Sequence, residues 1–235
     1  MQLSLRLSAI AAMVTEGNRL ADVGCDHGYL PVYLVLNHKI PGAIAMDVRK
    51  GPLSRAREHL LQYGLGNYIE TRLSDGLEAL KPGECETLVI AGMGGPLMEK
   101  ILTEGAEVRE SFQELILQPQ SDIGHFRHFI RENGWEIVKE DIILEEGTFY
   151  PMMKAVKSLE KELPPYTAAE EWFGKLLLEQ RHPVLKQYLE RELRLREEIL
   201  DRLLQAPSET AARRMKEIQE EKQLVLAALE RYESE

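Results

Sequence analysis

Short apolar runs alternate with segments of helical periodicity over the first half of the chain. The apolar runs cover residues 19–23, 43–48, 67–73, 87–91 and 114–118, and their lengths are typical of β-strands. Helical spacing of apolar residues fills the intervals, including residues 52–64 and 95–105, which both end at a glycine. Strands that alternate with helices predict an α/β fold in which helices cover a parallel sheet.

The segment after the fifth run completes the expected sheet. Residues 125–134 predict a helix that stops at Gly134, and residues 136–158 hold two strand-like runs joined without a helix. A closing hairpin of this kind makes the last strand antiparallel. The sequence therefore predicts a seven-stranded, Rossmann-like sheet with a closing antiparallel hairpin.

The N-terminal segment resembles a weak signal peptide in its apolar content. However, Arg6 interrupts the apolar stretch, and the apolar residues follow a helical stripe formed by Leu3, Leu7, Ile10 and Val14. We therefore expect an amphipathic helix of the mature protein.

The sequence pattern changes at Pro164 and Pro165, which break the periodicity and mark the exit from a first domain. We expect one domain over residues 1–160 and a helical domain over residues 161–235. Its first helix is expected from Glu170 to Gln205, with Pro207 ending it and Ser208 capping a second helix. The second helix keeps a 4,3 spacing through Ala211, Met215, Ile218, Lys222, Val225, Leu229 and Tyr232.

These two long helices predict an antiparallel, coiled-coil-like hairpin. The hairpin has two possible uses. It either stabilises the fold or serves as a dimer contact, or it grips a large substrate.

Composition limits the partners and the location. The net charge of −10 argues against a protein that coats nucleic acid, so an RNA partner must be held by individually placed arginines and lysines. No apolar run is long enough to span a membrane. The two cysteines, Cys25 and Cys85, offer neither metal spacing nor a disulfide framework. We expect a metal-free protein in a reducing cytoplasm.

The first strand runs into "DVGCDHGYLP", residues 22–31, at the kind of turn where nucleotide-type cofactors bind in α/β sheets. A glycine loop would alternate glycines at 24, 26 and 28, but the middle position holds Asp26, followed by His27. An acidic residue at the end of the second strand, Asp47, suits the two hydroxyls of a ribose. It fits a nicotinamide cofactor or S-adenosylmethionine equally well.

The third strand leads into "LSDG", where an aspartate and a backbone N–H can receive an adenine. The alternative role for Asp75 is a helix N-cap. The loop lacks the G-x-G-x-x-G pattern of dehydrogenases, and the closing hairpin favours a methyltransferase sheet, so we predict S-adenosylmethionine as cofactor, with Gly24 and Cys25 passing its methionine part. The expected cofactor residues are Asp22, Gly24, Cys25, Asp47, Val48, Ser74, Asp75, Gly76 and Gly92.

The fourth strand ends in "AGMGGPLM", residues 91–98. Gly92, Gly94 and Gly95 remove side chains, so a flat base can approach the backbone, and Met93 offers a polarizable side chain against a ring. The alternative is a tight turn with Met93 in the core.

Four features together resemble the bacterial TrmK family: "LADVGCDHGYLP", "AGMGGPLM", "LILQPQ" and the C-terminal hairpin. The resemblance covers nearly the whole chain. It implies a class I S-adenosylmethionine-dependent methyltransferase that acts on N1 of adenine 22 in the D-arm of tRNA, with a coiled-coil tail that helps to bind the tRNA. The chain departs from the usual family pattern at Gln120, where asparagine is commoner, and at Pro151, where an acidic residue is commoner.

This resemblance suggests roles for the unusual loop. Methylation at adenine N1 leaves a positive charge on the base, which the carboxylate of Asp26 would stabilise while orienting N1. His27 and Tyr29 would stack on or hydrogen-bond the extruded base, and Met93 would pack against it. Alternatively, Asp26 binds the amino group of the cofactor or holds the loop.

The expected tRNA contacts are basic side chains of the N-terminal helix and of the hairpin: Arg6, Arg191, Arg194, Arg196, Arg213, Arg214 and Lys216. We expect a monomer, with a dimer possible through the hairpin. Two other functions fit the residues: a methyltransferase that acts on a small molecule or a protein, and a non-catalytic RNA- or protein-binding module.

Overall fold

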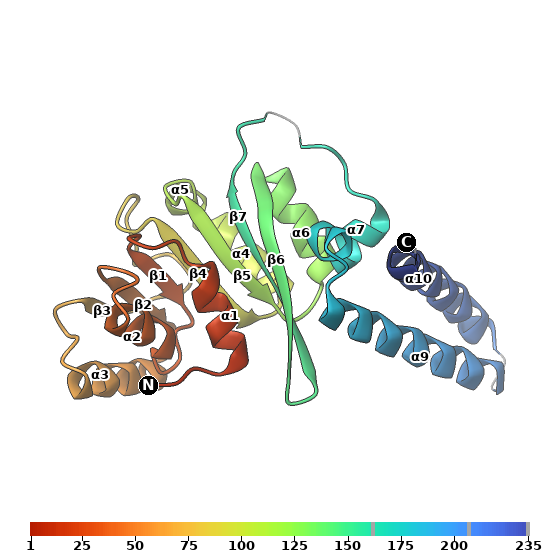
Figure 1. The fold of residues 1–235 in the computed structure, drawn as a ribbon, viewed down its shortest axis with the longest axis horizontal. Coiled ribbons are helices and arrows are strands. Elements are labelled where there is room, and N and C mark those ends of the chain that lie inside the picture. Colours follow the sequence, from red (N-terminus) through yellow and green to blue (C-terminus); the bar gives the residue numbers. More distant parts are fainter. Residues whose placement is uncertain (161–162, 206–207, 234–235) are drawn as a thin grey trace. The chain divides into compact units, whose positions relative to one another are not determined.

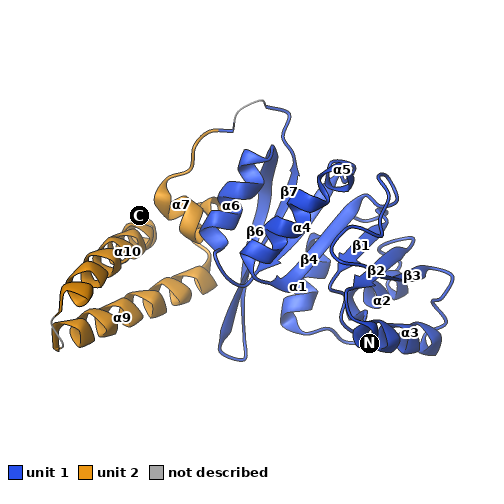
Figure 2. Cartoon of the chain, turned by 180° about the vertical axis from the view of Figure 1, so that it is seen from behind, with its two compact units in different colours: residues 1–163 blue, residues 164–235 orange. Residues whose placement is uncertain are grey.

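The protein is described by a computed structural model that covers residues 1–160, 163–205 and 208–233. The chain divides into two compact units, residues 1–163 and 164–235, which Figure 2 shows in different colours. The division falls at the two prolines, Pro164 and Pro165.

Unit 1 contains a seven-stranded sheet (Figure 1) in the order β3-β2-β1-β4-β5-β7-β6. Neighbouring strands from β3 to β5 are parallel, whereas β7 is antiparallel to both β5 and β6. This is the sheet of class I methyltransferases, and the predicted closing hairpin is confirmed. The strands are β1 (Leu20–Val23), β2 (Ala43–Asp47), β3 (Ile69–Leu73), β4 (Thr87–Met93), β5 (Glu114–Pro119), β6 (Trp135–Glu145) and β7 (Thr148–Lys157).

Helices cover both faces of this sheet, because right-handed crossovers to the two sides of β1 and β4 place them on opposite faces. One face carries α1 (Leu5–Met13), α2 (Tyr29–Leu36) and α3 (Lys50–Gln62). The other carries α4 (Gly95–Glu104) and α6 (Ile123–Glu132), with the short α5 (Ala106–Arg109) following α4. The expected N-terminal helix forms, although Leu3 and Val14 of the predicted stripe lie outside α1, and Ile10 is fully buried.

The segment after α1 is tied to the sheet through a buried carboxylate. Glu114, at the start of β5, accepts hydrogen bonds from the backbone N–H of Thr15 (2.9 Å), the hydroxyl of Thr87 (2.7 Å) and the ammonium group of Lys154 (2.6 Å). Burial raises the pKa of Glu114, but these donors outweigh it and hold the pKa below its ordinary value. The bonds fix the position of α1 beside the strands.

Unit 2 begins with two short helices rather than with one long helix. The expected continuous helix from Glu170 to Gln205 is wrong. The chain forms α7 (Ala168–Phe173), α8 (Lys175–Glu179) and α9 (Pro183–Gln205). Gly174 has a φ of 93° and Arg181 a φ of 49°, and these left-handed residues separate the helices. Pro183 then starts α9, where its missing N–H costs nothing.

The hairpin of α9 and α10 (Glu209–Glu233) has the predicted antiparallel form. Ile218 and Val225 are buried along its seam, and the seam residue Lys222 donates to Glu197 of α9 at 2.8 Å. Ala228, next to the predicted Leu229, is the fully buried residue of that turn. Ser208 caps α10, because its Oγ accepts the N–H of Ala211 at 3.0 Å. The expected helix stop at Pro207 lies outside the described residues.

Candidate cofactor site and its rim

The carboxyl ends of the parallel strands enclose a cavity of about 470 Å³, a typical volume for a small-molecule site. It lies where the strand order reverses between β1 and β4, the usual ligand position in such sheets. Nine of the residues that line it were expected at the site: Gly24, Asp26, Asp47, Val48, Ser74, Asp75, Gly76, Gly92 and Met93. The lining also includes Arg6, Arg49, Leu97, Ile101 and Gln120.

The loop between β1 and α2 alternates left-handed residues. Gly24, Asp26 and Gly28 have φ values of 75°, 49° and 68°. A Cβ on Gly24 would meet Cε of Met93, whose side chain would have to move, and the positive φ itself favours glycine there. Aspartate is among the few other residues that tolerate this backbone region. Asp26 therefore keeps the backbone path of a glycine loop while adding an exposed carboxylate to the cavity wall.

Two buried aspartates lie near the carboxyl ends of β1 and β2. Asp47 is 6% exposed, and its Oδ1 accepts the backbone N–H of Arg49 at 2.8 Å. Its Oδ2 has no hydrogen-bond partner within the described residues and is free for a ligand. Asp22 does not line the cavity. Burial, with the neighbouring charge of Asp47, raises the pKa of Asp22 to about 7, although Arg6 opposes this shift.

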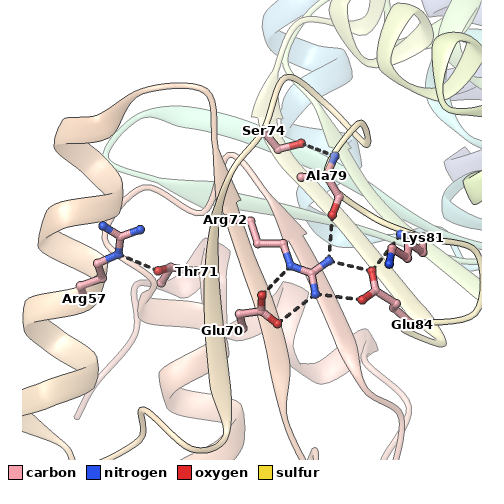
Figure 3. Close-up of polar contacts among 8 residues, drawn as sticks. All are labelled: Arg57, Glu70, Thr71, Arg72, Ser74, Ala79, Lys81 and Glu84. Carbon is pink, nitrogen blue, oxygen red and sulfur yellow. Dashed lines mark hydrogen bonds and ion pairs between the residues drawn. The ribbon is translucent and has the colours of Figure 1, made fainter.

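The turn after β3 is held by two sets of polar contacts (Figure 3). Ser74 Oγ donates to the carbonyl of Gly76 (2.9 Å) and accepts the N–H of Ala79 (3.1 Å). Arg72 binds both oxygens of Glu84 and the carbonyl of Ala79. Bonding to Arg72 lowers the pKa of Glu84 to about 2. No helix follows this turn, so the alternative role of Asp75 as a helix N-cap is wrong.

The glycines near the end of β4, Gly92 within it and two after it, serve two different purposes. The pairing of β4 with β5 shifts register between Ala91 and Met93, and Gly92 in the resulting bulge has a φ of 78°. Gly94 and Gly95 are needed for packing: their Cβ atoms would lie 2.9 Å and 2.7 Å from Ser121. Of the three glycines, only Gly92 lines the cavity, and the approach of a base to this turn stays a prediction.

Arg6 reaches the cavity from the start of α1. Glu145 of β6 accepts the backbone N–H of Leu5 at 2.6 Å and so positions the first turn. The Arg6 guanidinium donates to Gln118 Oε1 (3.2 Å) and lies 5.5 Å from the ring centroid of Tyr150. Arg6 was expected only as a tRNA contact. Because five strands separate it from β6 along the chain, no local pattern could indicate its place in the cavity wall.

Three expected loop residues lie outside the cavity lining. Cys25 is 7% exposed, and burial raises the pKa of its thiol. His27 and Tyr29 stand on the outer rim, where their rings stack with centroids 5.5 Å apart. They do not border the space where a cofactor would lie.

The expected tRNA contacts of unit 2 differ in their surroundings. Arg196 is 8% exposed and binds Glu192 (2.6 Å) and Glu221 (3.2 Å), so it joins α9 to α10 and is withdrawn as a candidate contact. Most of the others also pair with glutamates: Arg191 with Glu192, Arg213 with Glu217, and Arg214 with Glu217 and Glu221. Arg194 and Lys216 are exposed, with no carboxylate partner in the described part of the chain.

Two kinds of feature are absent from the described residues. No helix among them is long and apolar enough to cross a membrane. No group of three or more histidine, cysteine, aspartate or glutamate residues among them could hold a metal ion.

Comparison with known proteins places these features in context. Residues 3–153 match a family described as a methyltransferase domain. The tRNA (adenine(22)-N(1))-methyltransferase of Bacillus subtilis (strain 168) is 39% identical over 155 residues, which are 66% of this chain and 65% of that protein. That alignment thus spans just under two thirds of the relative.

Solved structures match over a greater length. The crystal structure of the B. subtilis M1A22 tRNA methyltransferase TrmK is 31% identical and covers 97% of this chain and 98% of its own, with a TM-score of 0.85. A putative tRNA (m1A22) methyltransferase of Streptococcus pneumoniae, in complex with S-adenosyl-L-methionine, is 31% identical and covers 97% of this chain and 100% of its own, with a TM-score of 0.87.

Proposed function

This chain belongs to the TrmK family of class I methyltransferases, and from that premise we propose that it methylates N1 of adenine 22 in tRNA, using S-adenosylmethionine. The observation that carries the proposal is the match of 97% of the chain, both units included, to B. subtilis TrmK. The cavity at the strand ends supports it independently, because its volume and its charged lining suit the methyl donor.

The cavity residues fit S-adenosylmethionine by their chemistry. Asp47 offers its free Oδ2 to the ribose hydroxyls, and Asp75 with the N–H of Gly76 offers an acceptor and a donor to the adenine. Val48 is 60% exposed and Leu97 48% exposed on the lining, which provides apolar contacts for a flat ring. The carboxylates on the wall suit the positive charges of the cofactor, and Arg6 suits its carboxylate.

The bound cofactor supplies a methyl group on a positively charged sulfur. The lone pair of adenine N1 attacks the methyl carbon, and the electrons of the breaking carbon–sulfur bond stay on sulfur. No proton has to be removed first, so the site needs no general base. The positive charge moves to the adenine, and we assign Asp26 the role of stabilising it from the cavity wall.

Unit 2 has a separate role in this proposal. We assign residues 164–235 to tRNA binding, with Arg194 and Lys216 as the exposed cations of the hairpin that remain without a carboxylate partner in the described chain. We also propose that the protein acts on tRNA as a monomer in the cytoplasm.

The test is methylation of unmodified tRNA transcripts that carry adenine or guanine at position 22, with labelled S-adenosylmethionine and nucleoside analysis. We expect 1-methyladenosine in the first transcript and no label in the second. Formation of N6-methyladenosine or methylguanosine, or equal labelling of both transcripts, would refute the assignment. Cofactor binding without transfer to any RNA would instead support a non-catalytic module.

A further inference from the structure

An aromatic and basic surface lies on the rim of unit 1, outside the cavity. It consists of His27, Tyr29, Arg55 and His59, from the loop before α2 and from α2 and α3, and we call it the α2–α3 surface. None of these four side chains lines the cavity. Asp26, one residue before His27, does line it, so the surface adjoins the cavity mouth.

The rings of the α2–α3 surface form a compact cluster that includes one stacked pair. The Tyr29 ring stacks on His27 with centroids 5.5 Å apart and an interplanar angle of 16°. His59 is tilted against both rings, 4.9 Å from Tyr29 and 6.1 Å from His27. Tyr29 remains 41% exposed despite these neighbours. An exposed, ordered aromatic stack adds little to the core, and such groups commonly mark a binding surface.

Hydrogen bonds hold this arrangement in place. His59 Nδ1 donates to the backbone carbonyl of His27 at 2.9 Å, and Arg55 donates to His27 Nε2 at 3.3 Å. Gly28 brings the start of α2 against α3, because a Cβ there would lie 3.2 Å from Cβ of Ala56. The stack is therefore preorganised without a ligand.

The charge of the surrounding segment is opposite to that of the whole protein. Residues 48–63 contain four Lys and Arg and one Glu, in a chain of net charge −10. The hairpin helices are balanced by comparison: α9 has five Lys and Arg and five Asp and Glu, and α10 has five and six. Lys50 and Arg55 have no carboxylate partner among the described residues. Uncompensated positive charge therefore collects on α3.

We propose that the α2–α3 surface binds a nucleotide that flanks the methylated adenine, with its base stacked on Tyr29 and its phosphate on Arg55. This inference rests on the proposed function and assigns the recognition surface beside the same site. Stacking on aromatic side chains and arginine contacts to phosphate are the standard means of holding unpaired nucleotides. Because the rings stand outside the cavity, the stacked base is a neighbour of the target and not the target itself.

The experiment compares full-length variants in binding of S-adenosylmethionine, binding of tRNA and methylation. Tyr29→Ala and Arg55→Ala should each weaken tRNA binding roughly ten-fold and leave cofactor affinity unchanged. Tyr29→Phe keeps the ring and should bind tRNA normally. Arg57→Ala is the matched control, because Arg57 lies on the same helix but donates to Thr71 of β3 (Figure 3). It should change tRNA affinity less than about two-fold. Arg55→Ala should also reduce the salt dependence of tRNA binding, measured as the slope of the logarithm of affinity against the logarithm of salt concentration, by an amount equivalent to about one phosphate contact.

An abasic tRNA substitution on either side of adenine 22 completes the test. At the stacked position, the abasic substitution should weaken binding to the wild-type protein but add no further loss to Tyr29→Ala. Losses that add at both positions, or variants that bind tRNA as wild type does, would overturn the inference. Failure of the proposed function would look different, because the wild-type protein itself would then not methylate adenine 22. Circular dichroism shows whether an alanine variant is misfolded. If Tyr29→Ala misfolds, the comparison of tRNA binding between Arg55→Ala and Arg57→Ala decides.

Discussion

At the scale of single residues, Asp26 shows that the cofactor loop requires a backbone conformation more than it requires empty space. Its φ of 49° matches the left-handed conformation of Gly24 and Gly28 on either side. The loop thus keeps its path and gains a carboxylate at the cavity wall. Asparagine tolerates the same backbone region, so it provides a variant of almost unchanged shape.

We predict that Asp26→Asn lowers the methylation rate at saturating substrates by about two to three orders of magnitude, because one preorganised charge is lost from the transition state. Cofactor affinity by calorimetry should change less than about two-fold. Asp47→Asn is the contrasting control, with weakened cofactor binding as its main effect. If saturating cofactor restores the rate of Asp26→Asn, Asp26 is a cofactor ligand instead.

A second prediction at this scale concerns Asp22, whose pKa burial raises from 3.8 to about 7. Between these pH values the folded protein holds a proton that the unfolded chain has released, so stability falls as the pH rises from about 4 to about 7. Asp22→Asn removes this penalty. Its free energy of unfolding relative to wild type should increase across the window, by at most about 4 kcal/mol, and level off above it. Denaturant melts at pH 4.5 and pH 8 measure this, and an unchanged difference would contradict the pKa shift.

At the scale of elements, the apolar periodicity correctly predicted α10 but did not indicate the two breaks in the chain before α9. Apolar spacing continues across Gly174 and Arg181, whereas the backbone leaves the helix at both residues. Helix ends are decided by backbone geometry and capping, as Ser208 shows at the start of α10.

We predict that Ser208→Ala destabilises the start of α10 by about 1 kcal/mol, because the N–H of Ala211 loses its acceptor. Hydrogen exchange of the first-turn amides is the direct measurement. Thr210→Ala is the matched control, since no cap bond is assigned to that exposed hydroxyl and alanine favours the helix. Equal protection in both variants would mean that the cap bond contributes nothing.

At the scale of the whole molecule, the cofactor cavity belongs to one of the two units alone. All the cavity residues lie in residues 1–163, which hold the complete seven-stranded sheet. We predict that the fragment 1–163 folds and binds S-adenosylmethionine within about three-fold of the full chain. Its tRNA affinity should fall at least ten-fold by gel shift. Normal methylation by the fragment at low tRNA concentration would show that the hairpin is an accessory.

The sequence by itself determined the sheet, because the alternation of strands and helices is a local property of apolar spacing. It also predicted that Asp47, Asp75 and Gly24 lie at one site, since the carboxyl ends of parallel strands meet at one edge, and all three line the same cavity. Contacts between residues far apart along the chain could not be predicted in this way. Only tertiary packing brought Arg6 to the cavity and buried Arg196 between two helices. Only packing placed His59 beside Tyr29. The direction of a long side chain depends on which helices meet, and no local pattern specifies that.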